Sequence, residues 1–104
     1  MGRIEILFNY RQAIRQAEKL ENLSSRLKKL ARDKLSDTMG KLQNCWQSDH
    51  SNQYLRKVDL VRAELNETAA RMESVAHAIR ETAEAVKNAE LRALEIARKR
   101  TYEG

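Results

Sequence analysis

The chain has 104 residues, of which 41% are hydrophobic and 34% are charged, and its net charge is +5 at pH 7. It contains no Pro and only three Gly, so it lacks the residues that usually interrupt helices and form turns between strands. This composition is typical of long, half-buried helices and excludes a thick globular core. We therefore predict a single all-α domain over residues 1–104, which at this size is marginally stable without a partner chain.

The first predicted element is a helix over about residues 9–44. Asn9 is a good N-cap, and the residues before it are expected to form an extended lead-in or a ragged first turn. Apolar residues then recur at steps of three and four from Tyr10 to Leu42, which predicts one buried stripe. Gly40 could end the helix as a C-cap, but the stripe continues past it.

A turn at about residues 45–48 precedes a second predicted helix over about residues 49–100. Its apolar stripe runs from Val58 to Ile96 in steps of three and four without a break. The residues that widen this stripe are Leu55, Ala69, Ala76, Ala83 and Ala97. Because short connections join antiparallel neighbours, we predict a two-helix hairpin that pairs with a second hairpin into a four-helix bundle.

The connection between the helices carries the chain's only Trp, in the triplet Trp46-Gln47-Ser48. Two long helices in about a hundred residues with this central motif resemble the WXG (Trp-x-Gly) family of small helical-hairpin proteins of type VII (ESX-like) secretion. The resemblance covers nearly the whole chain, with Ser48 in the place of the family's Gly. Tyr54 resembles an aromatic often found early in the family's second helix. Trp46 could belong to a surface that the secretion ATPase reads, or it could simply close the end of the hairpin as an apolar plug.

The resemblance also implies an export signal late in the second helix, formed by an aromatic residue and an acid four positions later. The matching place here begins with Val86 and ends with Glu90, so the acid is present and the aromatic is absent. Val86 and Glu90 are therefore a candidate degenerate export signal, and their alternative roles are a core residue and an ordinary exposed carboxylate. The missing aromatic leaves open whether the chain is secreted cargo or the escort of a larger effector.

The partner implied by this resemblance is another helical protein. It could be a second copy, another small helical protein, or the helical N-terminal domain of a larger effector. The middle of the partner-binding surface is expected at Leu27, Leu65, Met72 and Ile79. The chain would be made in the cytoplasm without a signal peptide and then secreted. An intracellular coiled-coil adaptor or antitoxin-like module would use the same apolar stripes.

Other function classes find little support in the sequence. No nucleophile with a neighbouring base, no phosphate-binding loop and no set of metal ligands is present, so we predict neither catalysis nor a cofactor nor a metal. A basic run from Arg26 to Lys34 could bind RNA, but acidic residues are interspersed and aromatics for base stacking are scarce. We therefore predict no nucleic-acid partner. No apolar run approaches the length of a membrane span, so we also predict no membrane insertion.

Overall fold

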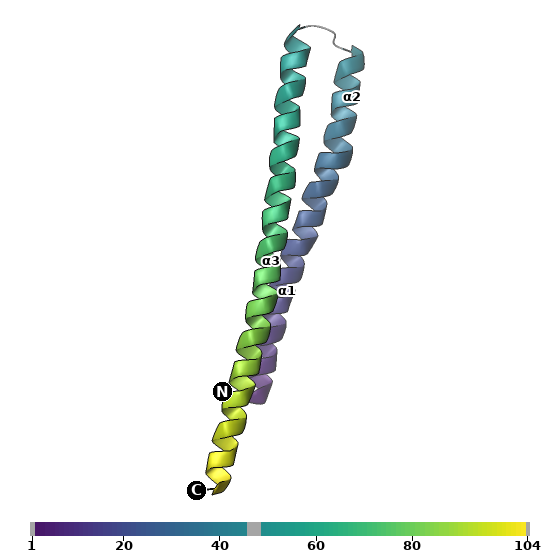
Figure 1. Cartoon of the computed structure of the whole chain (residues 1–104). Helices are drawn as coiled ribbons and strands as arrows, with labels where there is room; N and C mark the ends of the chain where they lie inside the picture. The colour runs from purple at the N-terminus through teal and green to yellow at the C-terminus, as the bar shows by residue number, and fades with distance from the viewer. Residues whose placement is uncertain (1, 46–48, 104) are drawn as a thin grey trace. The chain divides into compact units, whose positions relative to one another are not determined.

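The computed structural model describes residues 2–45 and 49–103, and it describes side chains within 2–41 and 52–101. All the secondary structure in these ranges is helical, which confirms the all-α prediction (Figure 1). The elements are α1 (Arg3–Lys29), the π-helical turn η1 (Leu30–Lys34), α2 (Leu35–Cys45) and α3 (Asp49–Glu103). The Trp46-Gln47-Ser48 motif lies outside the described residues.

The predicted start of the first helix is wrong, whereas its predicted end near residue 44 agrees with α2. Helix α1 begins at Arg3 rather than at a cap on Asn9, and the backbone N–H of Ile6 already donates to the carbonyl of Gly2 at 3.1 Å. Since Ile6 is only 2% exposed, packing of this first turn outweighs the local capping preference of Asn9. Gly40 lies inside α2 and does not end it, and no glycine in the described ranges has the positive φ of a C-cap.

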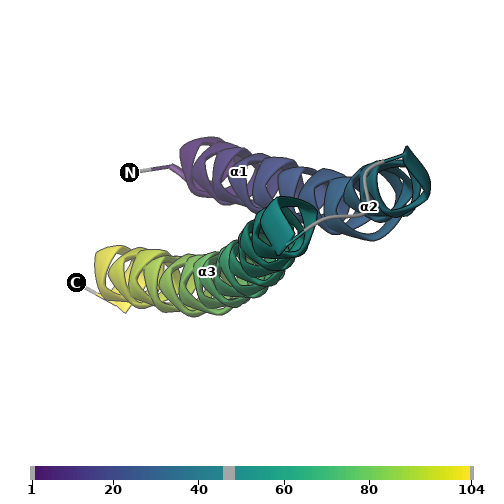
Figure 2. The ribbon, with the colours of Figure 1, turned by 90° about the horizontal axis from the view of Figure 1, so that it is seen from above.

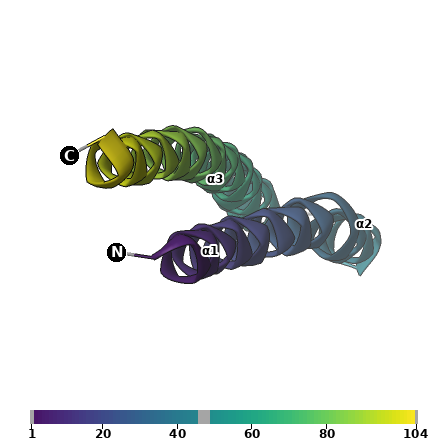
Figure 3. The ribbon, with the colours of Figure 1, turned by 90° about the horizontal axis from the view of Figure 1, so that it is seen from below.

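The chain divides into two compact units. Unit 1 comprises residues 1–20 and 74–104, and unit 2 comprises residues 21–73. In unit 1 the start of α1 lies antiparallel to the second half of α3, whose last turns extend past the beginning of α1 (Figures 1 and 3). In unit 2 the rest of α1, η1 and α2 lie antiparallel to the first half of α3; Figure 2 looks onto the end where α2 stops and α3 starts.

The buried positions are small residues that recur every seven positions. On the first half of the chain they are Ala17, Ser24 and Ala31, and on α3 they include Ala69 and Ala76. A seven-residue repeat keeps one side of a helix against its neighbour, and small side chains allow the two backbones to approach closely. Among the described side chains, the larger buried apolar residues are Ile6 and Leu55. Little apolar surface is therefore removed from water within each unit.

The structure distinguishes the two rows of apolar side chains on α3 by their burial. Ala69 and Ala76 are buried, Ala83 is half-buried and Ala97 is exposed, whereas the main stripe remains half-buried or exposed. We call this main stripe the outer face of α3. Its described members from Val58 to Ile96 include Val61, Leu65, Met72, Val75, Ile79 and Val86.

The π turn η1 shifts the repeat by one residue. The backbone N–H of Leu35 donates to the carbonyl of Leu30, so this turn holds one residue more than an α-helical turn. Seven residues after the buried Ala31, Thr38 is exposed, and the next residue, Met39, is half-buried instead. The extra residue thus moves a different column of side chains toward α3 within unit 2.

Candidate functional site

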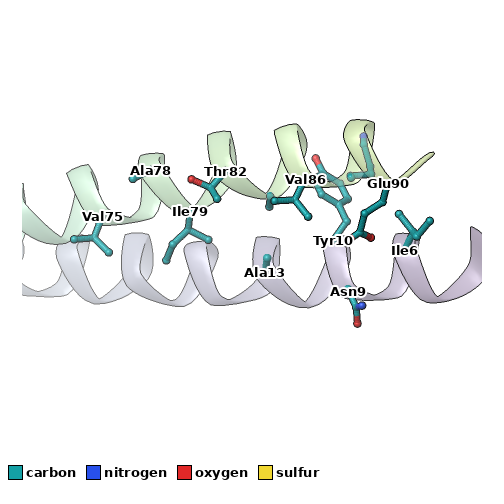
Figure 4. A pocket seen from close by; sticks show the side chains of 12 residues that line it. Ile6, Asn9, Tyr10, Ala13, Val75, Ala78, Ile79, Thr82, Val86 and Glu90 are labelled. Atoms are coloured by element: carbon teal, nitrogen blue, oxygen red, sulfur yellow. The ribbon is translucent and has the colours of Figure 1, made fainter. Parts of the chain in front are cut away.

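The described side chains of unit 1 form a groove of about 490 Å³. Four residues of α1 and eight of α3 line it, and it is bounded mainly by apolar atoms (Figure 4). The lining residues are Ile6, Asn9, Tyr10, Ala13, Val75, Ala78, Ile79, Thr82, Ala83, Val86, Lys87 and Glu90. We call this hollow the unit 1 groove.

The spacing of these residues follows the geometry of two antiparallel helices. Val75, Ile79, Thr82 and Val86 follow one another at steps of four, three and four, so they form one row along α3. Ala13 on α1 faces this row, and because its side chain is small, an open trough remains between the helices (Figure 4). Val75 is 50% exposed and Val86 is 47% exposed, although both are apolar.

One end of the groove is polar. The ammonium of Lys87 lies 4.3 Å from the centroid of the Tyr10 ring, in a cation–π contact between α3 and α1. Glu90, one turn further along α3, extends toward α1 between Tyr10 and Ile6 (Figure 4). No ion pair to the half-buried Glu90 is found among the described residues. The groove therefore combines apolar walls with one carboxylate that has no salt bridge to any described side chain.

The structure brings together three of the residues that the sequence singled out. Val86, Glu90 and Ile79 all line the unit 1 groove. Leu65 and Met72, also predicted for the partner-binding surface, are half-buried in unit 2. Leu27 is likewise half-buried in unit 2, so none of the four predicted seam residues is fully covered within the chain.

The contribution of α1 to this groove was not predicted. Ile6 was assigned to a lead-in, and Tyr10 was assigned only to a buried stripe, yet both lie opposite Glu90. Antiparallel pairing could have indicated this proximity, because it sets the first turns of the chain against a late segment of the second helix. The exact register could not be read from the sequence, because alanines occupy the closest positions on both sides.

Large apolar side chains are also exposed outside the groove. Their exposed fractions range from 37% for Leu30 to 85% for Ile4. In unit 2 they are Leu23 and Leu30 on the first half of the chain and Tyr54, Leu60 and Val61 on α3. Isolated exposed apolar residues are common, but this number on so small a chain marks surfaces suited to a protein partner.

Unit 2 also contains a polar cluster, which joins its first residues to its last residues. The Ser24 hydroxyl lies 2.8 Å from the carbonyl oxygen of Ala69 and 3.1 Å from Oε1 of Glu73, so its single proton is shared between two acceptors. Lys28 forms a salt bridge with the same carboxylate. The hydrogen bond from Lys28, and then that from Ser24, lowers the pKa of Glu73 below its usual value. This cluster sets the register of the helices in unit 2.

The basic run of the first half is partly neutralised. Lys28 pairs with Glu73, and Nε of Arg32 lies 3.0 Å from Oδ1 of Asp33. The hydrogen bond from Arg32 lowers the pKa of Asp33.

An exposed pair on α3 is formed by His77 and Glu81, whose Nε2 and Oε1 atoms lie 2.7 Å apart and which have the spacing of an aromatic–acid motif. These interactions are those of a charged helix surface.

The described residues provide neither a metal site nor a membrane span. They contain no group of three or more His, Cys, Asp or Glu residues that could hold a metal ion. They also contain no helix with a segment sufficiently long and apolar to cross a membrane. Comparison of the chain with protein-family models, curated proteins and solved structures finds no match.

Proposed function

We propose that this chain is a helical pairing protein that folds as an antiparallel two-helix hairpin and completes a four-helix bundle with a second helical hairpin. The supporting observation is the placement of its apolar side chains. Alanine and serine occupy most buried positions, whereas valines, leucines and isoleucines on the outer face of α3 and on α1 remain in contact with solvent. A partner that covers these side chains would supply the apolar burial that the chain itself lacks.

In the cell, the bundle would act in a type VII secretion system as secreted cargo or as the escort of a larger effector. The supporting argument is the resemblance carried by Trp46-Gln47-Ser48 between two long helices. In this proposal the partner is another small helical protein or the helical N-terminal domain of the effector, and the secretion ATPase reads the assembled bundle. Such a role requires no catalytic group, because it depends on the shape and the surface of the assembled bundle.

Pairing is tested by the mass of the purified chain, alone and after co-expression with the product of the adjacent gene, measured by light scattering during size-exclusion chromatography. We expect a complex of two hairpins in one of the two samples. Leu65→Asp should abolish it, since a charge would be placed among half-buried apolar side chains. Asn66→Asp adds the same charge at an exposed neighbouring position and should leave the complex intact.

Secretion is tested by following the chain in the culture medium of its host. We expect it in the medium of the wild-type strain and only in the cells of a strain without the membrane ATPase. Retention in the cells of both strains, together with intact pairing, would instead favour the intracellular adaptor or antitoxin-like module.

A further inference from the structure

We propose that the unit 1 groove binds one amphipathic helix of a different protein, which presents bulky aliphatic side chains to the groove and a Lys or Arg to Glu90. This inference rests on the proposed function, to which it adds the chemistry of the partner. It depends on the shape of the groove, on the small residues beside it, and on the carboxylate at its end.

The shape of the groove fits a helix. Its row of Val75, Ile79, Thr82 and Val86 has the three-and-four spacing at which side chains of a third helix would interdigitate. The hollow is open along its length and is apolar except at one end. Small-molecule sites, by contrast, enclose most of the ligand and direct several polar groups at it.

The surface beside the groove favours a close approach. Ala78, Ala85 and Ala89 are exposed on α3, at positions where a solvated helix usually carries charged residues. Because these side chains are a single methyl group, a partner helix could approach the backbone of α3 closely while its own larger side chains fill the hollow. Bulky aliphatic residues on the partner therefore complement small residues on this chain.

Glu90 gives the partner a charge preference. Its carboxylate lies at the end of the apolar hollow, while the nearby ammonium of Lys87 contacts the Tyr10 ring instead. Covering Glu90 with an apolar or acidic side chain would remove water from a carboxylate that has no ion pair among the described residues, which is unfavourable. A basic side chain at this point would compensate the lost hydration.

A second copy of this chain fits less well than a different protein. Each copy has a net charge of +5, so self-pairing would bring two basic molecules together. The groove itself contributes one carboxylate and one ammonium, and the ammonium is already engaged. A neutral or acidic partner that bears a local basic residue satisfies both the whole-molecule charge and Glu90.

The test uses the full chain and two fluorescent, helix-stabilised synthetic peptides of about 20 residues. Both carry Leu at steps of four and three and have zero net charge; one carries Lys at each end and the other carries Glu at each end, so the result depends neither on peptide direction nor on the net charge of the chain. We expect the Lys peptide to bind about fivefold more tightly by fluorescence anisotropy. Glu90→Lys should reverse this preference, and Glu90→Gln should remove it.

Thr82→Arg places a long charged side chain in the groove and should weaken both peptides at least about tenfold. Asn88→Arg adds the same charge at an exposed position outside the groove and should not. Equal affinity for the two peptides, no binding, or binding that survives Thr82→Arg would overturn the proposal. It would also be overturned by a self-dimer that Thr82→Arg dissociates and neither peptide displaces.

These outcomes are separable from those of the proposed function. If the chain pairs and is secreted but shows no peptide preference, only the chemistry assigned to the groove is wrong. If the peptides behave as expected but the chain neither pairs with a hairpin nor leaves the cell, the groove assignment stands and the secretion role fails.

Discussion

Units 1 and 2 use the same small-residue packing but differ in the contacts that hold their helices. In unit 2, Ser24, Lys28 and Glu73 connect the helices through hydrogen bonds and a salt bridge, and Arg62 Nη1 lies 3.3 Å from the Ser36 hydroxyl. In unit 1, the ammonium of Lys87 lies over the Tyr10 ring. Directional bonds specify the register of unit 2, whereas unit 1 retains an apolar hollow open to a partner.

The largest expected effect concerns the close packing that both units share. Ala69→Leu inserts three heavy atoms at a position with no exposed surface, next to the carbonyl that accepts from Ser24. Overpacking of this kind should lower the free energy of unfolding by about 1–3 kcal/mol, measured by urea denaturation followed by circular dichroism. Ala70→Leu, at the exposed neighbouring position, is the matched control. Equal losses in the two variants would contradict the close approach of the helices.

Removal of the register-setting hydroxyl should have the next largest effect. Ser24→Ala leaves the close packing in place but deletes the donor to Ala69 and Glu73, so the free energy of unfolding should fall by about 1 kcal/mol. Ser25→Ala, which changes an exposed residue, should have almost no effect in the same assay. A loss confined to Ser24→Ala would sharpen the contrast between the units, because it would assign the register of unit 2 to this hydroxyl.

Gly40 offers a gain within unit 2. It lies inside α2, and a Cβ added to it would meet no atom within 4 Å. Gly40→Ala should therefore raise the free energy of unfolding by about 0.5–1 kcal/mol, because alanine has the higher helix propensity. Gly2→Ala also meets no atom within 4 Å but lies outside the helix, so it should change thermal stability much less. Destabilisation by Gly40→Ala would contradict the open space found around this glycine.

The smallest effect should be a pH dependence of unit 2. Since the pKa of Glu73 is lower in the folded chain than its usual value of 4.5, its contribution to stability is present above pH 4.5 and is lost as the pH falls through the lowered folded value. Thermal melts of the wild type and of Glu73→Gln should therefore differ at neutral pH and converge in acid. Glu67→Gln, which removes an exposed partner of Arg71 within α3, controls for charge. A difference that persists in acid would exclude ionisation as its cause.

Much of the helical structure could be predicted from the sequence. The absence of Pro and the steps of three and four between apolar residues indicated two long helical segments, and Val86, Glu90 and Ile79 were singled out before the groove was known. Which row of α3 lies against the first half of the chain could not be decided from the sequence, because alanine serves both as a common helix former and as the residue that permits close packing. Only the opposing helix distinguishes these roles, so Ala69 and Ala76 could not be identified from periodicity alone.

The start of α1 and the π turn were missed for related reasons. The sequence before Asn9 is compatible with an extended lead-in or a ragged first turn, and burial of Ile6 stabilises the helical turn. The π turn at Leu30–Lys34 has no composition of its own, and it becomes recognisable only when the side chains before and after it are compared with their burial. Both features depend on tertiary contacts rather than on local preference.

The π turn also sets the rotation of the α2 side chains about the helix axis. One residue of an α-helix corresponds to about 100° of rotation, so deletion of a single position within Leu30–Lys34 would rotate every later side chain of α2 by that amount while shortening the helix by only about 1.5 Å. A chain related to this one but without the extra residue would present a different column of α2 to its surroundings. Any alignment between the two would therefore need a one-position gap at this turn.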